Sequence, residues 1–518
     1  MKKIILLFMV STGLVAQVGI GTVTPDASSA LEIESTSAGI LIPRMTEAQR
    51  TAIGSPATGL LVYQTNNTAG FWYYSGSGWA ALGSSSSWEL TGNAGTNPST
   101  NFIGTTDDVD LKFRRNNLEV GDITNYNIAF GESSFVNPVN AFYNVAIGNN
   151  AMENITGADG NVAIGWNALQ ANTSSAALVA IGNGALANNT EENNVAIGSG
   201  SMSANTVGTN NTAVGTGSLQ SNINGNANIS IGYYSLYNNV DGGANCALGF
   251  YALRDNSSGI YNSAFGNQSL QFNTTGNYNT ALGSFSQQQN VTGIENTSVG
   301  TYSLRNITSG NRNTSVGYSS SGGNGSDSFN TALGAYAVTN AGYSNATAIG
   351  YATTVSSDNT VRIGNNSVTS IGGYTNWSNI SDGRFKTNVR EDVVGLEFIL
   401  KLRPVTYRLD MDAIARFNRL PDSLRLNQAE QLKSKEIQSG FIAQEVEQAA
   451  ISSNYNFHGV EKPNDDNSHY GLRYAEFVVP IVKALQEQQQ IINDQNKKIE
   501  TLELQLLDLK AMIQAKLN

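Results

Sequence analysis

A period of seventeen residues through the middle of the chain constrains its fold more than any other feature. The phrase Asn-Val-Ala-Ile-Gly at Asn144–Gly148 returns at Asn161–Gly165 and at Asn194–Gly198. The closing glycines are spaced 17 residues apart in most repeats and fall at 131, 148, 165, 182, 198, 215, 232, 249, 266, 283, 300, 317, 334, 350 and 364. Such a period is typical of solenoids, in which each repeat buries its apolar side only by stacking on its neighbours. We therefore predict a β-solenoid.

The repeat also predicts which side chains face the core. The residue before each glycine is large and apolar, as in Ile147, and we expect it to fill the inside of the coil. The residue before that is Ala or Ser, and it should point outward because strand side chains alternate. A later pair, such as Ala168-Leu169, predicts a second short strand in each repeat. The asparagine four residues before the glycine predicts a ladder of hydrogen-bonded amides along the axis.

These repeats resemble the head of trimeric autotransporter adhesins, which are left-handed parallel β-rolls built on an Asn-x-Ala-Ile-Gly consensus. The resemblance covers roughly residues 127–365, and we place the head domain at 127–370. It implies a homotrimer. The longer period of this chain implies longer return loops between strands.

The sequence offers several alternatives to a structural fibre. An in-register array of threonines could bind ice or a regular polymer; its members are Thr280, Thr297, Thr314, Thr331 and Thr347. The same repeat position holds Val in earlier coils and lies on the expected apolar side, which favours a structural role. A glycosidase needs two placed carboxylates, and the repeats supply no convincing pair. The net charge of −11 gives no basic footprint for nucleic acid. One cysteine, Cys246, and two histidines make a metal site improbable, so we expect no cofactor and treat Cys246 as an inert filler.

The first sixteen residues have the features of a secretory signal peptide. Lys2 and Lys3 precede the apolar run Ile4–Val15, and Ala16 is a small residue at the expected cut. The alternative is a membrane anchor, but the run is too short to span a bilayer comfortably. We therefore expect a secreted or cell-surface protein without a transmembrane segment in the mature chain.

Residues 17–126 are expected to form small β fibre modules. Short apolar and aromatic runs lie between Gly- and Ser-rich turns, at Val18–Thr22, Gly39–Arg44, Gly59–Tyr63 and Gly70–Tyr74. The run Ser84–Ser87 is typical of a flexible join. This block resembles the N-terminal region of bacterial tail-fibre-domain proteins, a resemblance that assigns it no chemistry.

The last forty residues carry a heptad pattern. Apolar residues recur seven apart at Val478, Leu485, Ile492, Ile499, Leu506 and Ile513, beside a second series at Ile481, Gln488, Gln495, Leu502 and Leu509. This pattern predicts a homo-oligomeric coiled coil at 478–517, in which the two glutamines can set register and oligomeric state. The alternative is an amphipathic helix that packs on its own domain.

A group of motifs lies between the solenoid and this helix. Ser381-Asp-Gly-Arg-Phe-Lys386 is followed by Leu402–Tyr407, by Gly440–Glu445 and by Tyr474. In this order they resemble the intramolecular chaperone auto-processing domain of phage endosialidase tailspikes and related fibres, a peptidase domain that we place at 381–477. In that family a serine–lysine dyad releases the chaperone once the fibre has trimerised. The resemblance implies Ser381 as nucleophile, Lys386 as general base, and the Ile380–Ser381 bond as the cleavage site.

The chemistry of such a dyad is demanding. A lysine that titrates near 10.4 is almost wholly protonated at neutral pH. To accept a serine proton its pKa must fall by about three units, which corresponds to about 4 kcal/mol of differential solvation. Burial can cause such a shift. We therefore expect trimer closure to bury Lys386, so that cleavage would report correct assembly. Arg384, Gln444 and Glu445 are expected to be structural.

The sequence thus predicts a mainly β, secreted, trimeric surface fibre or adhesin: a left-handed parallel β-roll with 17-residue repeats, a mixed α/β chaperone domain and a coiled coil. Its only predicted catalysis is one cut in its own chain. Its partners are expected to be two further copies of itself and a cell-surface or glycan ligand that the sequence does not identify. The alternatives are an ice- or glycan-binding solenoid, and an uncleaved fibre with a structural C-terminal domain.

Overall fold

The computed structural model describes residues 17–83, 92–136, 138–466 and 468–517. The predicted signal peptide at 1–16 and the Ser84–Ser87 join lie outside these residues. The chain divides into two units, Met1–Gly104 and Thr105–Asn518, which are described separately. Within the described part of the chain, no helix has the length and apolar character needed to cross a membrane.

The N-terminal unit contains small β-sheets and one short helix. A parallel pair, β1 (Val18–Ile20) with β2 (Leu31–Ile33), precedes a four-stranded sheet in the order β3 (Arg44–Met45), β4 (Leu61–Gln64), β5 (Gly70–Tyr74) and β6 (Trp79–Ala81). Helix α1 (Glu47–Thr51) places the buried Arg50 against this sheet. The Arg50 guanidinium lies 3.9 Å from the Trp72 ring centroid, and its Nε donates to Gln64 Oε1 at 2.7 Å. Arg50 thus anchors α1 to the sheet.

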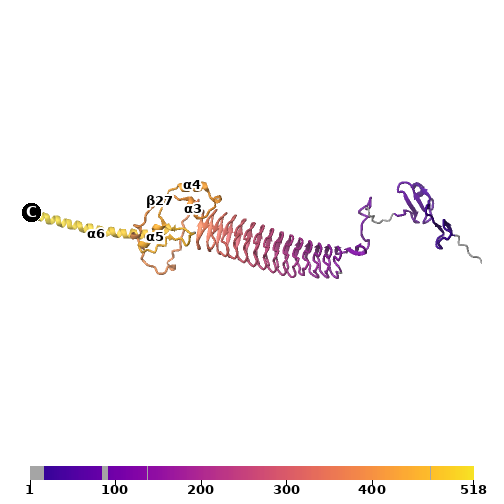
Figure 1. The fold of residues 1–518 in the computed structure, drawn as a ribbon, viewed down its shortest axis with the longest axis horizontal. Helices are drawn as coiled ribbons and strands as arrows, with labels where there is room; N and C mark the ends of the chain where they lie inside the picture. The colour runs from indigo at the N-terminus through magenta and orange to yellow at the C-terminus, as the bar shows by residue number, and fades with distance from the viewer. Residues whose placement is uncertain (1–16, 84–91, 137, 467, 518) are drawn as a thin grey trace, which may run out of the picture. The chain divides into compact units, whose positions relative to one another are not determined.

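The second unit begins with the solenoid, whose coils stack along one direction (Figure 1). An antiparallel hairpin of β7 (Leu111–Arg115) and β8 (Leu118–Ile123) pairs with β9 (Ile128–Phe130), the first strand of the stack. From there each coil adds one parallel strand in exact repeat register, so that Val145 pairs with Val162 and Ile147 with Ile164. The remaining strands of this ladder are β10 (Val145–Ile147), β11 (Val162–Ile164), β12 (Val179–Ile181), β13 (Val195–Ile197), β14 (Thr212–Val214), β15 (Ile229–Ile231), β16 (Cys246–Leu248), β17 (Ser263–Phe265), β18 (Thr280–Leu282), β19 (Thr297–Val299), β20 (Thr314–Val316), β22 (Thr331–Leu333), β24 (Thr347–Ile349) and β26 (Val361–Ile363). The parallel solenoid predicted from the period is confirmed.

The predicted facing of the strand side chains is wrong. Ala247 is fully buried, whereas its neighbour Leu248 is 43% exposed, and the same inversion holds along the ladder. The reason is that most coils already have a large apolar residue inside them, supplied by the segment after the glycine. Leu253 is one of these, and it is fully buried. Opposite such a side chain only Ala or Ser fits, so the large residues of the strands point outward.

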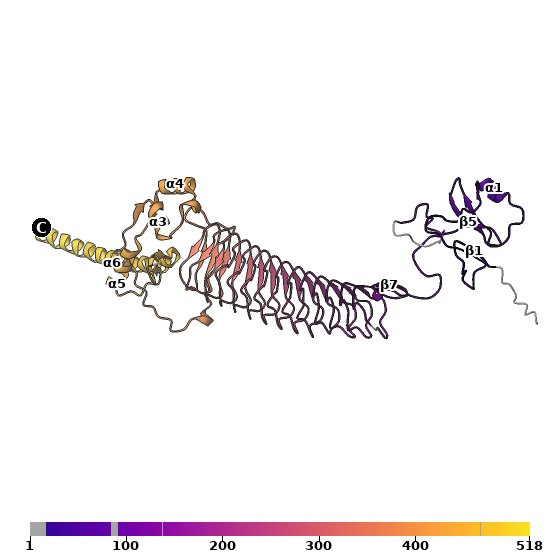
Figure 2. The same cartoon turned by 45° about the vertical axis from the view of Figure 1, so that its right-hand side comes forward.

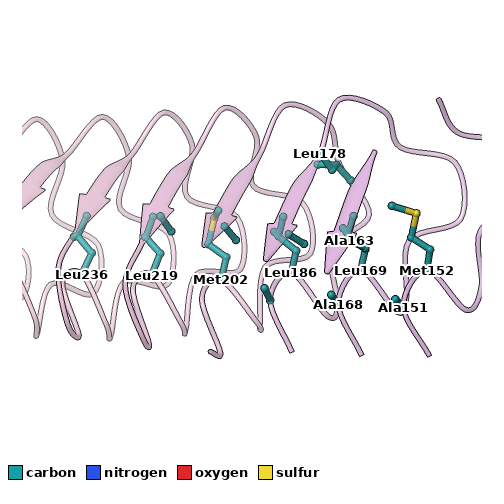
Figure 3. Packing of buried hydrophobic residues seen from close by; sticks show 14 of the residues in the cluster. Ala151, Met152, Ala163, Ala168, Leu169, Leu178, Leu186, Met202, Leu219 and Leu236 are labelled. Atoms are coloured by element: carbon teal, nitrogen blue, oxygen red, sulfur yellow. The ribbon is translucent and has the colours of Figure 1, made fainter. Parts of the chain in front are cut away.

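The inner core is therefore a row of Leu and Met side chains facing small ones (Figure 3), from Met152, Leu169, Leu186, Met202, Leu219 and Leu236 onward. These residues do not form the second strand predicted for every repeat. Leu169 and its equivalents have positive φ values near 50° and lie in turns. Among the residues that the structure describes, second strands occur near the end of the stack, as β21 (Ser321–Gly322), β23 (Val338–Thr339) and β25 (Thr354–Val355).

The predicted asparagine ladder is present and buried. Asn245 Nδ2 donates to Asn228 Oδ1 at 3.2 Å, and the Asn245 backbone N–H donates to the same oxygen at 3.0 Å. A second ladder, absent from the predictions, joins Asn239 Nδ2 to Asn222 Oδ1 at 2.8 Å. Both ladders satisfy polar backbone groups in the turns that each coil must bury.

After the solenoid the chain forms a mixed α/β region and then a long helix (Figure 2). A small core forms around Phe398, Val446, Phe457 and Phe477. The elements in order are η1 (Gly383–Phe385), α2 (Leu396–Ile399), β27 (Val405–Tyr407), α3 (Met411–Phe417), η2 (Asp422–Leu424), α4 (Asn427–Lys435), β28 (Gln438–Gly440), α5 (Ala443–Ser452), β29 (Val460–Glu461), β30 (Gly471–Leu472), η3 (Tyr474–Phe477) and α6 (Val478–Leu517).

Candidate functional site

A single 3-10 turn positions the two residues predicted to be catalytic. Asp382 caps η1 by accepting a hydrogen bond from the Arg384 backbone N–H at 2.9 Å. The Arg384 guanidinium also binds the Asp382 carboxylate, with Nη2 at 2.6 Å, and this hydrogen bonding lowers the pKa of Asp382. The turn reverses the chain between Ser381 and Lys386. Asp382 and Arg384 thus have the structural role expected of Arg384.

Ser381 and Lys386 meet across this turn. Lys386 Nζ donates a hydrogen bond to Ser381 Oγ at 2.9 Å. Both side chains are exposed in the single chain, and Ile380, on the other side of the predicted cleavage site, is 87% exposed. The arrangement places an amine beside a hydroxyl at an open peptide bond.

The other motifs of the region contact one another. Strand β27 pairs antiparallel with β28, which joins Val405 to Gly440. The Tyr474 hydroxyl accepts a hydrogen bond from the Phe441 backbone N–H at 3.1 Å. Arg403 Nε donates to Glu445 Oε2 at 3.0 Å. The Arg403–Glu445 pair is exposed, so Glu445 joins α5 to the segment before β27 at the surface of this region.

The outward large residues of the solenoid form a second candidate functional surface. We call it the outer apolar row; its members are exposed or half-buried and comprise Ile147, Ile164, Ile181, Ile197, Val214, Ile231, Leu248, Phe265, Leu282, Val299, Val316, Leu333, Ile349 and Ile363. Leu282 reaches 49% exposure. A continuous exposed apolar stripe of this length marks an interaction surface.

The residues two positions before each member of the outer apolar row also face outward. They include the threonine array and Cys246. Thr280, Thr297 and Thr314 are exposed and pair in register. The expectation that this slot lies on the inner, apolar side is therefore wrong. Cys246 is half-buried, and burial raises the pKa of its thiol, which keeps it in the less reactive protonated form.

Helix α6 carries a third exposed apolar surface. Its first turns pack on the domain, where Pro480 and Ala484 are buried and Glu487 Oε2 accepts from the Leu396 backbone N–H at 2.7 Å. Beyond these turns the heptad residues are open to solvent; Ile499 is 51% exposed. Packing on its own domain, the alternative for this helix, therefore accounts only for its beginning.

Comparison with known protein families gives two matches. Residues 19–98 match the family model described as phage tail like trimerisation region, and residues 381–455 match the model described as chaperone of endosialidase, a peptidase family. A comparison with curated proteins gave no match. The two matches support a tail-fibre protein with a C-terminal chaperone domain, and the trimerisation region supports a homotrimer. Sequence reasoning had assigned no role to the N-terminal block, because its short strands carry no motif with a chemical meaning.

Proposed function

We propose that the chain is a secreted, trimeric surface fibre that cuts itself between Ile380 and Ser381 with Ser381 as nucleophile and Lys386 as general base. The observation that carries this proposal is the 2.9 Å hydrogen bond between Lys386 Nζ and Ser381 Oγ. The match of residues 381–455 to a peptidase family adds support.

The proposed reaction consumes one water molecule. Neutral Lys386 takes the hydroxyl proton of Ser381 while Oγ attacks the carbonyl carbon of Ile380. The proton then passes to the backbone nitrogen of Ser381 as the C–N bond breaks, which leaves an ester between the Ile380 carbonyl and Oγ. Water hydrolyses this ester. The products are a carboxylate at Ile380 and a new amino terminus at Ser381.

Assembly would switch this reaction on. An exposed ammonium is stabilised by water, whereas burial disfavours the charged form of a lysine. Lys386 is exposed in the single chain. Contact with neighbouring subunits would remove that water and free the amine to act as a base. The outer apolar row and the exposed heptads of α6 would supply the contacts that bring three chains together.

The proposal is tested by the intact mass of the expressed mature chain. The wild-type chain should yield two fragments that meet between Ile380 and Ser381. Ser381→Ala and Lys386→Ala should both stay full length, while Lys435→Ala, which removes an exposed lysine elsewhere in the domain, should cleave like the wild type. Cleavage that persists in Lys386→Ala would refute the dyad.

A further inference from the structure

In the uncut chain, the last coils of the solenoid are covered by a segment of the C-terminal region that we call the docking lobe, residues 417–433. Lys433 Nζ donates to the backbone carbonyl oxygens of Asn366 at 2.7 Å and Val368 at 2.6 Å. Asn418 Nδ2 donates to Asn366 Oδ1 at 3.1 Å. The last coil therefore ends in polar groups whose partners come from beyond the proposed cleavage site.

A charged residue takes a core position at this end of the solenoid. Arg362 of β26 pairs with Ala348 and so occupies the inward position that Ala or Ser holds in earlier coils. Burial lowers the pKa of its guanidinium, and the negative charge of Glu461 opposes that shift. Arg362 forms no hydrogen bond or ion pair with any residue that the structure describes. A half-buried guanidinium without such a partner is stabilised by any anion that can reach it.

A second donor without a partner lines the same cavity as Arg362. Asn366 Nδ2 is buried and has no hydrogen-bond partner among the described residues. Arg362 and Asn366 line a small cavity of about 20 Å³ together with Asn418 and Leu420 of the docking lobe. Buried donors normally have acceptors. Two such donors in one cavity, one of them cationic, therefore indicate a site for a carboxylate.

The neighbouring surface of the last coils favours a sugar as the carrier of that carboxylate. Tyr336, Asn340 and Thr354 line a cavity of about 410 Å³ between the solenoid and the docking lobe. Aromatic rings with a few amide and hydroxyl groups are typical of small-ligand sites, and they suit the apolar face and the hydroxyls of a sugar. The solenoid residues that line this cavity are all neutral, whereas an acidic peptide would need several cations.

The uncut chain occupies the same surface with polar groups of its own. The Tyr343 hydroxyl, in the larger cavity, donates a hydrogen bond to the carboxylate of Asp465. Asp465 and Glu461 both lie on the C-terminal side of Ser381, as does the docking lobe. Release of the cut fragment would take all of these groups away and leave Arg362 and Tyr343 on the fibre, open to a ligand.

We propose that release of the cut C-terminal fragment uncovers a binding site for an acidic sugar at the end of the solenoid, with Arg362 and Asn366 Nδ2 as donors to its carboxylate. The proposal rests on the proposed self-cleavage for the cut that opens the site. It gives the proposed fibre a ligand class, a polysaccharide that contains uronic acid units. The docking lobe keeps the site closed until the cut is made.

The first test compares the cut and the uncut protein by calorimetric titration, with a short oligogalacturonate as the probe. The self-cleaved wild-type fibre is separated from its fragment by size exclusion, and the uncut sample is Ser381→Ala. We expect the cut fibre to bind the probe at least about 10-fold more tightly than the uncut chain. The methyl ester of the probe, which lacks the negative charges, and an oligoglutamate, which carries them on a peptide, should both bind the cut fibre more weakly.

Variants of the two donors test the site itself. Arg362→Gln should weaken binding of the probe to the cut fibre by about 10- to 100-fold, since it removes a charged donor. Arg362→Lys should keep part of the affinity. Arg312→Gln, a matched change at an exposed arginine of the solenoid, should not alter binding. Asn366→Asp replaces the unpaired donor by a carboxylate and should also weaken binding, which provides a second test where Arg362→Gln fails to assemble.

A second way of opening the site separates this proposal from self-cleavage. Every residue at 371–380 is exposed, so a recognition sequence for a site-specific protease can be introduced there in the Ser381→Ala chain. Binding of the probe after that cut supports the site even when the wild-type chain does not cut itself. A fragment that stays on the fibre after the cut, equal binding before and after it, unchanged binding in Arg362→Gln or Asn366→Asp, or tighter binding of oligoglutamate than of oligogalacturonate would overturn the proposal.

Discussion

Replacing Asn228 by alanine tests the idea that buried amides hold the solenoid together. Asn228 is fully buried. Its Nδ2 donates to Gly242 O at 2.9 Å and to Asn211 Oδ1 at 3.2 Å, and its Oδ1 accepts the backbone N–H of Asn245 at 3.0 Å. The Gly242 oxygen keeps a second donor, Asn239 Nδ2 at 2.9 Å. The backbone N–H of Asn245 loses its acceptor, Asn228 Oδ1.

The size of the effect follows from these partners. A buried donor left without an acceptor costs about 1–3 kcal/mol, and each remaining lost hydrogen bond about 0.5–1.5 kcal/mol. We therefore expect Asn228→Ala to lower the free energy of unfolding by about 2–6 kcal/mol per chain.

Guanidinium unfolding followed by circular dichroism measures this loss. The matched control is Asn224→Ala, which truncates an exposed asparagine of the neighbouring turn and should change the free energy of unfolding by less than about 0.5 kcal/mol. Equal unfolding midpoints for the two variants would refute the view that the amide ladder carries stability.

Three further predictions concern the subunit surface, the glycine turns and pH. Leu282→Lys in the outer apolar row should leave the single chain folded but prevent trimer formation in sedimentation, whereas Thr275→Lys on an exposed turn should still form trimers. Gly249→Ala should lower the melting temperature strongly because its φ is +143° and a Cβ would come within 2.4 Å of the Gly266 carbonyl oxygen, whereas Gly54→Ala, where a Cβ meets open space, should not. Hydrogen bonds from Lys462 and Tyr470 lower the pKa of Glu447, so its stabilising effect is present above the unfolded-state pKa near 4.5 and is lost as pH falls through the lower folded-state value. The difference in melting temperature between wild type and Glu447→Gln should therefore shrink on acidification, and a difference that is constant with pH would contradict this reasoning.

The 17-residue period alone was enough to predict the stacked coils and their strand register, because every repeat follows the same backbone path. Alternation along a strand then separates two faces but does not say which is inside. The missed signal was the leucine after the glycine, such as Leu253, which already fills the coil and leaves room only for Ala247 opposite it. Because the large strand residues face outward, they form an exposed surface and not the core.

The candidate site was predictable in part. The Ser381–Lys386 spacing and the Asp-Gly turn between them suggest proximity, and the 3-10 turn provides it. The docking lobe could not be predicted, since Lys433 and Asn366 are far apart in sequence and share no periodic pattern. Arg362 could have been noticed in the sequence, because it is a charged residue at a strand position that holds Ala or Ser in the other coils.

The mass of the native assembly tests the central claim most directly. In the proposed fibre, three chains together would cover the outer apolar row and the heptads of α6 and would bury Lys386. Native mass spectrometry of the expressed mature Ser381→Ala chain should give three times the chain mass at micromolar concentration. A stable monomer would contradict the fibre, the proposed burial of Lys386 and the link between assembly and cleavage.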